Sequence, residues 1–428
     1  MTFRPNPWRY LILAGAIHIA LTTTIFLVGH YQLLPATFDE NGIGLTFALD
    51  GTSYRRLAIG LVEEWQRNGF QAWLDLSAPF HSRLHSLLFA TVGSVLGHNI
   101  LAVEPLNLVC YLGVLTCIYF LGREIFDARA GLLAAAIVAV WPTFLLNSTQ
   151  LMRDSFAILC FLALMVVLVL ILTREFAWHR GVLAGIGGAI AVTLFWITRG
   201  NMWNVVLAAI AIAIVMWLLR MVRQKRFVAG NAIVLLLIVI AALLVPSRLQ
   251  SSTLPGSRPP ASPFAIPSAS QPAPPEGVWR RVINQIANRR AGFQSFSSQM
   301  SNIDPDVRLN SFGDIVRFIP RAAVIGFFAP FPKMWIEPGA FGRAGRLLSG
   351  LETLVMYFLY VAAGFCLWRE RRNLALWFLF LVATIGIVGL GLVVVNAGAL
   401  YRIRYVFWML LIVTAAQGIL NYLTTRRT

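Results

Sequence analysis

Long apolar runs, separated by short polar connections, follow one another along most of the chain. Ten of these runs come close to the twenty or so residues that a helix needs to cross a membrane. They occupy residues 11–30, 101–122, 130–147, 154–173, 181–198, 203–220, 230–246, 351–368, 374–395 and 403–423. The pattern therefore predicts an all-α polytopic membrane protein with about ten transmembrane helices.

A shorter apolar run at 84–98 raises the question of whether it crosses as well. If it does not cross and the N-terminus is cytoplasmic, every inner connection carries Arg or Lys, as the positive-inside rule requires. If it crosses, the basic stretch at 220–227, "RMVRQKRF", falls outside. We therefore expect 84–98 to lie as a juxtamembrane helix at the outer interface, with both termini cytoplasmic. The apolar run at 320–335 is broken by three prolines, and we expect it to dip into the membrane and return.

This topology leaves two large outer segments and divides the chain into three sections. Residues 1–246 are expected to form an N-terminal catalytic transmembrane module, with the first outer loop at 31–100. Residues 247–350 are expected to form a periplasmic loop that begins with a Pro- and Ser-rich stretch and continues with interfacial helices. Residues 351–428 are expected to be C-terminal transmembrane helices.

Composition and charge agree with this reading. A chain with 58% hydrophobic and 12% charged residues cannot fold as a soluble globule. The net charge of +17 comes almost wholly from arginine, with only Lys225 and Lys333 beside it. In so apolar a chain, this excess of positive charge indicates binding to membrane lipids and a role in setting the topology, and not binding to nucleic acid. The four cysteines lie inside apolar runs and predict neither a disulfide nor a zinc site.

The placement of charges favours an enzyme over a transporter. An ion-coupled transporter keeps ionisable groups deep in the membrane. In this sequence, His18 is the ionisable residue that stands well inside an apolar run, and a packing role suits it better than a role in transport. Charges gather instead at the expected outer ends of helices. An acid ringed by arginines suits a base acting beside a bound phosphate. Asp50 is the first candidate for that acid, and Asp39 and Glu40 are its rivals.

Several motifs between residues 47 and 156 resemble a known family. They are "LDGTSYRRLAIGL", "VLG", "LGREIFDARA", the Trp-Pro pair at 141–142 and "STQLMRDSF". Their order and spacing are similar to the N-terminal module of the type C glycosyltransferase superfold (GT-C). Within it, they look most like bacterial relatives of the protein O-mannosyltransferases and of the aminoarabinose transferase of lipid A.

The resemblance implies an enzyme of the bacterial inner membrane with its active site facing the periplasm. It would pass a sugar from a polyprenyl-phosphate carrier to a lipid, glycan or protein acceptor, with inversion at the sugar carbon. In that family, an acid of the first outer loop deprotonates or orients the acceptor hydroxyl, and its position matches Asp50. Asp154 matches a second acidic position. Some members use a divalent cation, Mg²⁺ or Mn²⁺, and others none; Asp50 and Asp154 are the candidate ligands.

Further side chains near the expected outer face are candidates for binding the substrate and the carrier phosphate. They are Tyr54, Arg55, His81, Arg83, His85, Arg153, Arg199, Arg402 and Arg404. The alternative for each arginine is an anchor to lipid headgroups. The alternative for Asp50 is a helix N-cap, and that for Asp154 is pairing with a helix N-terminus.

Two departures from the family weaken part of this assignment. Ser53 stands where close relatives carry a basic residue. In addition, relatives begin the interfacial helix with a proline-containing stretch, and in this chain the proline stands earlier, before His81. Two other functions stay open. One is a polysaccharide polymerase or ligase that uses a polyprenyl-diphosphate-linked glycan, and the other is a lipid-linked sugar flippase. Asp50 in the first outer loop favours the GT-C reading.

Overall fold

The structure, a computed structural model, describes residues 7–39, 42–251, 277–295, 301–336 and 342–425. Regular structure in these residues is helical, with two isolated β-bridges, so the predicted all-α class is confirmed. The α-helices are α1 (Pro7–His30), α2 (Leu49–Asp75), α3 (Phe80–Thr91), α4 (Gly93–Leu96), α5 (Ile100–Ile125), α6 (Ala128–Ala139), α7 (Pro142–Ser148), α8 (Asp154–Thr173), α9 (Trp178–Arg199), α10 (Trp203–Gln224), α11 (Ala229–Ser251), α12 (Val278–Ser295), α13 (Phe312–Phe328), α14 (Pro332–Ile336), α15 (Gly342–Arg369), α16 (Leu374–Val393), α17 (Ala397–Ile403) and α18 (Tyr405–Thr425).

Within the described residues, eight helical stretches are long and apolar enough to cross a membrane, or nine if the pair α6 and α7 counts as one broken span. This pair is bent by 70° and covers the run predicted at 130–147. With 12 residues, α6 is only about 18 Å long and does not cross a hydrocarbon core of about 30 Å by itself. The short helices α3, α4, α13 and α14 are not among the candidate spans.

One of the eight stretches, Trp178–Gln224, contains both α9 and α10. The two helices run in opposite directions along α8. Arg199, at the end of α9, pairs with Asp154 at the start of α8, whereas Arg220, near the end of α10, donates to the carbonyl of Ile171 at the other end of α8. The stretch therefore crosses twice, and with the broken span the total agrees with the ten runs seen in the sequence.

The contacts within the chain form two units, which are described separately. The first unit contains Met1–Ser252, Phe358–Ala383 and Trp408–Thr428, and the second contains Thr253–Tyr357 and Thr384–Phe407. The section 351–428, expected from the sequence to be C-terminal transmembrane helices, contributes residues to both units.

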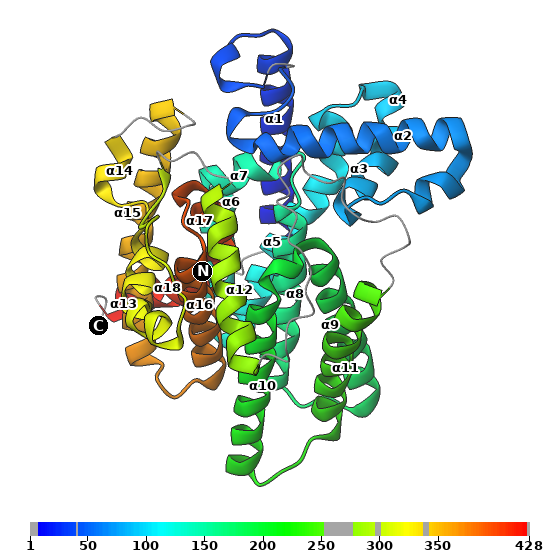
Figure 1. The fold of residues 1–428 in the computed structure, drawn as a ribbon. Coiled ribbons are helices and arrows are strands. Elements are labelled where there is room, and N and C mark those ends of the chain that lie inside the picture. The colour runs from blue at the N-terminus through cyan, green and yellow to red at the C-terminus, as the bar shows by residue number, and fades with distance from the viewer. Residues whose placement is uncertain (1–6, 40–41, 252–276, 296–300, 337–341, 426–428) are drawn as a thin grey trace. The chain divides into compact units, whose positions relative to one another are not determined.

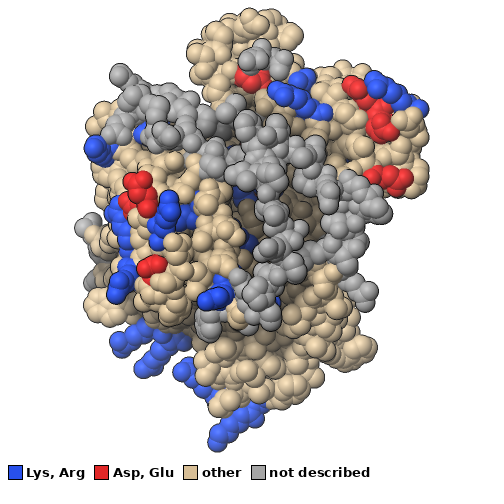
Figure 2. All heavy atoms as spheres, viewed as in Figure 1, with Lys and Arg blue, Asp and Glu red and all other residues tan. Residues whose placement is uncertain are grey.

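In the first unit, α5 packs against α1, α6 and α8, and α9 packs against α8 and α11. Helices α2 and α3 pack together and lie across one end of this bundle, which we name the α2 end (Figure 1). The opposite end carries the arginines of the α8 and α10 C-termini. Figure 2 shows basic side chains at the lower edge of the face that it draws.

The turn between α5 and α6, part of the family-like motif, has a structural explanation. A Cβ atom added to Gly122 would lie 2.5 Å from Cα of Gly131, so these glycines let the two helices touch. Asp127 caps α6, because its carboxylate accepts hydrogen bonds from the backbone N–H groups of Arg129 and Ala130, both at 2.8 Å. This motif therefore builds the bundle at the end opposite to α2.

In the second unit, α13 begins with a capping box in which Ser311 and Asp314 satisfy each other's backbone N–H groups. Helix α13 packs closely on α16, since a Cβ atom at Gly391 would meet the carbonyl oxygen of Ala322. Arg290 of α12 is buried and donates to three backbone carbonyls, those of Asp304, Val307 and Leu392. These contacts tie α12 to the segment before α13 and to the end of α16.

Candidate functional site

Four segments that are distant in sequence meet at the α2 end of the first unit. They are the first turns of α2, the start of α3, the start of α8 and the end of α9. Gly51 of α2 approaches Leu151, and the rings of Phe80 on α3 and Phe156 on α8 lie 6.0 Å apart. The polar residues of these segments therefore share one region of the unit, and most of the predicted site residues of the N-terminal module lie there.

A buried ion pair joins α8 to α9 in this region. The guanidinium Nη2 of Arg199 lies 2.7 Å from Oδ1 of Asp154, and both side chains are about 95% buried. Transferring each charged group from water to the protein interior costs roughly several kcal/mol of free energy, and the attraction between the two paired charges offsets this cost. The pair fixes the start of α8 against the end of α9. The charge of Asp154 is balanced by that of Arg199. Asp154 is therefore suited to positioning the residues of this region.

Two buried histidines of α3 belong to this region. His81 and His85 are one helical turn apart and are 3% and 2% exposed. Burial, together with the nearby His85 and Arg153, lowers the pKa of His81 to about 3, although the charge of Asp154 opposes this shift. Burial likewise lowers the pKa of His85 to about 4. Both imidazoles are therefore neutral near pH 7, and positive charge at the site comes from arginine.

Both ring nitrogens of His81 are buried polar atoms of this region that the described part of the chain leaves available for a hydrogen bond. Neither nitrogen has a hydrogen-bond partner among the described residues, although both are buried. An unsatisfied buried polar atom costs roughly 1–3 kcal/mol and is rare in a folded protein. The ring of Tyr54, from α2, meets that of His81 edge-on with centroids 4.3 Å apart. The imidazole can thus hydrogen-bond to a substrate hydroxyl or phosphate without adding charge.

Asp50 lies in the first turn of α2 and is exposed. The N-cap position is Ala48, so Asp50 is not the N-cap of this helix. Tyr54 follows one turn later on the same helix face, as the sequence predicted. Asp50 is thus an accessible carboxylate beside the helix N-terminus, while Tyr54 connects that helix face to His81.

Asp39, the rival acid, is bound within its own turn. Its Oδ1 accepts a hydrogen bond of 2.9 Å from the backbone N–H of Ile43, and its own N–H donates to the carbonyl of Gly44. Glu40 lies outside the described residues. Arg55 donates from Nε to the carbonyl of His98 at 2.7 Å; burial lowers its pKa, and the charge of Asp39 raises it.

Other predicted phosphate ligands are engaged in the fold. Arg83 donates to the carbonyls of Trp73, Leu74 and Leu76, and its guanidinium lies over the Trp73 ring. It therefore closes the turn between α2 and α3. A role of Arg83 in carrier binding stays a prediction that this geometry does not favour.

Arg404 belongs to the second unit and is fully buried. Its guanidinium donates to the carbonyls of Gly326 and Ala329, at 2.6 and 2.5 Å, and lies over the Tyr401 ring. These contacts tie α17 to the end of α13. Arg402, on the same short helix, is partly exposed. The carrier-phosphate role of both arginines is likewise still a prediction.

The described residues contain no group of three or more His, Cys, Asp or Glu side chains that could hold a metal ion. Asp154, one of the two expected ligands, is paired with Arg199. The residues in view therefore do not fit a resident divalent cation, and the mechanism proposed below derives no step through one.

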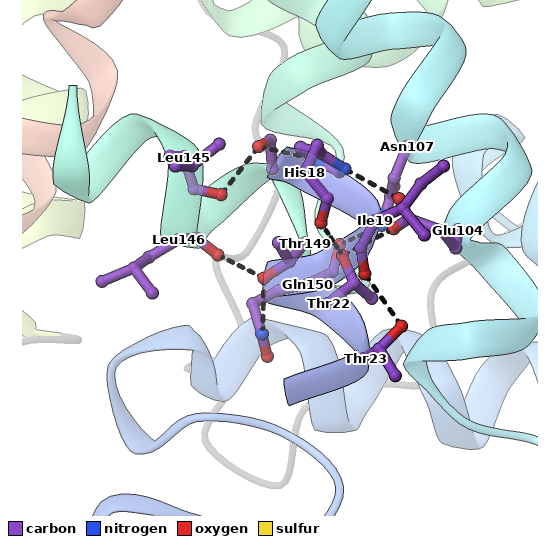
Figure 3. Close-up of polar contacts among 11 residues, drawn as sticks. His18, Ile19, Thr22, Thr23, Glu104, Asn107, Leu145, Leu146, Thr149 and Gln150 are labelled. Carbon is purple, nitrogen blue, oxygen red and sulfur yellow. Dashed lines mark hydrogen bonds and ion pairs between the residues drawn. The ribbon is translucent and has the colours of Figure 1, made fainter. Parts of the chain in front are cut away.

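Sequence reasoning missed one acid near the site. Glu104 lies within α5, one of the membrane spans, and is 8% exposed. It pairs with His18 of α1, so His18 is not the lone ionisable residue in the apolar runs (Figure 3). The signal was present in "LAVEPLN", where an acid stands near the beginning of an apolar run.

Comparison with known proteins supports the family resemblance. Residues 81–245 match the family model of dolichyl-phosphate-mannose-protein mannosyltransferase. The matched segment runs from α3 into α11, and it agrees with the resemblance drawn from the motifs. No curated protein matches the chain.

Two solved structures from Archaeoglobus fulgidus also align with the chain. One is an oligosaccharyltransferase in the apo form, and the other is the oligosaccharyltransferase AglB in complex with an inhibitory peptide and a dolichol-phosphate. Each shares 13% sequence identity with this chain at a TM-score of 0.49; 98% of this chain and 51% of the other are covered. The chain thus spans about half the length of these proteins.

The fold defines the class. The chain is an all-helical polytopic membrane protein, and residues 81–245 match a mannosyltransferase family model.

Proposed function

We propose that the protein is a membrane glycosyltransferase that moves a sugar from a polyprenyl-phosphate carrier to an acceptor hydroxyl at the periplasmic face of a bacterial inner membrane. The observation that carries the proposal is the meeting of an exposed acid, neutral histidines and a buried Asp–Arg pair at the α2 end. The histidines and the Asp–Arg pair lie in the segment that matches the mannosyltransferase family model, and the acid precedes it. The acceptor can be a lipid, a glycan or a protein.

In the proposed reaction, Asp50 accepts the proton of the acceptor hydroxyl as the oxygen attacks the sugar C1. The bond between C1 and the carrier phosphate oxygen breaks, and the polyprenyl phosphate leaves with the electron pair. A single displacement from the opposite side inverts the configuration at C1. A positioned general base of this kind contributes roughly 10²- to 10⁴-fold to the rate.

The other residues have supporting roles. Arg153 supplies positive charge where the phosphate leaves, because negative charge grows there in the transition state. The Asp154–Arg199 pair holds the start of α8 in place. Tyr54 and the neutral His81 hydrogen-bond to the sugar or the phosphate.

The test is transfer of radiolabelled sugar from a panel of polyprenyl-phosphate sugars to membrane extract. We expect Asp50→Asn to lower kcat by about 10²-fold or more while donor binding persists, since the amide cannot take the proton. Asp75→Asn is the matched control, an exposed acid at the other end of the same helix.

Other outcomes would change the assignment. Full activity of Asp50→Asn would assign the base to Asp39 or Glu40. No transfer from any monophosphate carrier, by the wild type, would indicate a polymerase or ligase that uses a diphosphate-linked glycan.

A further inference from the structure

A buried polar network connects α1, α5 and the end of α7 (Figure 3). Nδ1 of His18 lies 2.7 Å from Oε1 of Glu104, and Nε2 of His18 lies 2.9 Å from Oγ of Ser148. The hydroxyl of Thr22 donates to the other carboxyl oxygen of Glu104 at 2.8 Å. The side chains of His18, Thr22 and Ser148 are almost completely buried.

The hydrogen bonds determine how many protons the pair holds. The Ser148 hydroxyl donates its hydrogen to the carbonyl of Leu145 at 2.8 Å. Its oxygen therefore accepts a hydrogen bond from the protonated Nε2 of His18. One further proton must lie between Nδ1 of His18 and Glu104. The pair is either imidazolium with carboxylate or imidazole with carboxylic acid. It is neutral overall in both forms, which makes it tolerable between membrane helices.

The network reaches the turn between α7 and α8. Besides the contact of His18 with Ser148, Asn107 of α5 donates to the carbonyl of Gln150 at 3.2 Å. The side-chain oxygen of Gln150 in turn accepts a hydrogen bond of 3.1 Å from the backbone N–H of Leu45. Helices α1 and α5 therefore fix the turn 148–151 through His18 and Asn107. The same turn fixes the loop that precedes Asp50, through the hydrogen bond to Leu45.

A second contact joins the same turn to α2. A Cβ atom added to Gly51 would lie 3.5 Å from the carbonyl oxygen of Leu151, so α2 begins in van der Waals contact with the turn. Asp50 precedes Gly51, and Asp154 follows Leu151 by three residues. The turn therefore lies between the two acid-bearing segments and contacts both the loop and the helix that carry Asp50.

We propose that His18 and Glu104 are positioning residues, which hold the turn 148–151 and thereby set the placement of Asp50 relative to Asp154. The inference rests on the proposed function for its kinetic consequence, whereas its structural consequence can be measured without any activity. Misplacement by about 1 Å can lower a rate roughly 10²-fold, so a remote pair can matter for catalysis.

The central variant is the double substitution His18→Leu with Glu104→Leu. An apolar pair of similar volume commonly replaces a buried ion pair with little loss of stability. Thr22 keeps the carbonyl of residue 18 as an acceptor, and Ser148 keeps that of Leu145. We therefore expect the fold to persist, kcat to fall about 10- to 100-fold with KM unchanged, and amide exchange in residues 39–48 to accelerate at least 10-fold.

Two further variants separate positioning from general stability. Glu104→Gln keeps the network, because its amide can donate to Nδ1 of a neutral His18 and accept from Thr22, so wild-type kcat and exchange are expected. Gln150→Leu leaves the His18–Glu104 pair intact but removes the acceptor of the Leu45 N–H, and it is expected to accelerate exchange in the same peptide. Thr24→Val is the control, because among the described residues the exposed hydroxyl of Thr24 donates to the carbonyl of Ala20 within α1 itself.

The outcomes are distinguishable. Unchanged exchange in 39–48 and unchanged kcat in the double variant would overturn the proposal, as would a Glu104→Gln variant as impaired as the double variant. If the wild type transfers no sugar from any donor, the proposed function fails, and hydrogen exchange alone decides whether the pair positions the loop.

Discussion

At the residue scale, the chemistry of the site depends on which groups are charged. The two imidazoles of α3 are buried and neutral, and the arginine of the buried pair is engaged by Asp154. The exposed Asp50 and the partly exposed Arg153 are charges of this region that a substrate can meet. An acid that takes a proton and a cation that faces a leaving phosphate are the two charges that the proposed transfer requires.

The lowered pKa values predict how stability depends on pH. In the unfolded chain, a histidine binds a proton below about pH 6.5, whereas folded His81 and His85 do so only near pH 3 and 4. The unfolded state therefore binds more protons between these values, and the folded state loses up to about 1.4 kcal/mol per pH unit per histidine as pH falls below 6.5.

The measurement is the melting temperature of the purified protein in detergent from pH 7.5 to 5. The wild type should lose stability across this range, and a His81→Gln, His85→Gln double variant should lose less. An identical pH dependence in both proteins would contradict the lowered pKa values.

At the element scale, closely packed helices determine where the ends of the spans lie. Helices α9 and α11 touch through glycines: a Cβ atom at Gly181 would lie 2.4 Å from the carbonyl oxygen of Gly230, and one at Gly188 would lie 2.6 Å from the Ile238 side chain. Small residues at such positions let membrane helices approach each other. Because Arg199 ends α9, this packing also places the ion pair.

This packing yields a matched pair of variants. Gly181→Ala forces a methyl group against backbone, which cannot move aside easily, and should lower the melting temperature by several degrees, corresponding to roughly 1–3 kcal/mol. Gly187→Ala, on the same helix, has no atom within 4 Å of its added Cβ and should be neutral or slightly stabilising. Equal melting temperatures for the two variants would contradict the close packing of α9 on α11.

At the scale of the whole molecule, the path of the chain through the membrane decides which loops share a side. The contacts at the two ends of α8 imply that α9 and α10 cross in opposite directions. The connection at 200–202 and the basic end of α10 therefore lie on opposite faces. From the positive-inside rule, we predict that the basic end of α10 lies in the cytoplasm.

Labelling with a membrane-impermeant maleimide tests this path. In intact cells, whose outer membrane is permeabilised, a cysteine in place of Asn201 should react and one in place of Lys225 should not; after lysis, both should react. Three of the four native cysteines are buried and the fourth is partly buried, so background labelling should be low. Reaction of both positions in intact cells would rule out the double crossing.

The sequence by itself determined the class of the protein and much of its topology. Runs of about twenty apolar residues leave few alternatives to membrane helices, because every backbone polar group in lipid must be satisfied within the chain. The arginines at one side fixed the expected orientation. The motifs between 47 and 156 led to the family, and they did so through turns such as that of Gly122 and Asp127, whose local chemistry is readable in sequence.

Only the tertiary structure decided which polar residues act together. His18 and Glu104 are 86 positions apart, and Asp154 and Arg199 are on different helices, so no periodicity or spacing could pair them. The structure also engaged Arg83 and Arg404 with backbone carbonyls, although in the sequence they are indistinguishable from arginines that face a substrate. The physical reason is that burial and partners, not residue type, determine whether a charge is available, and both arise only when the helices pack.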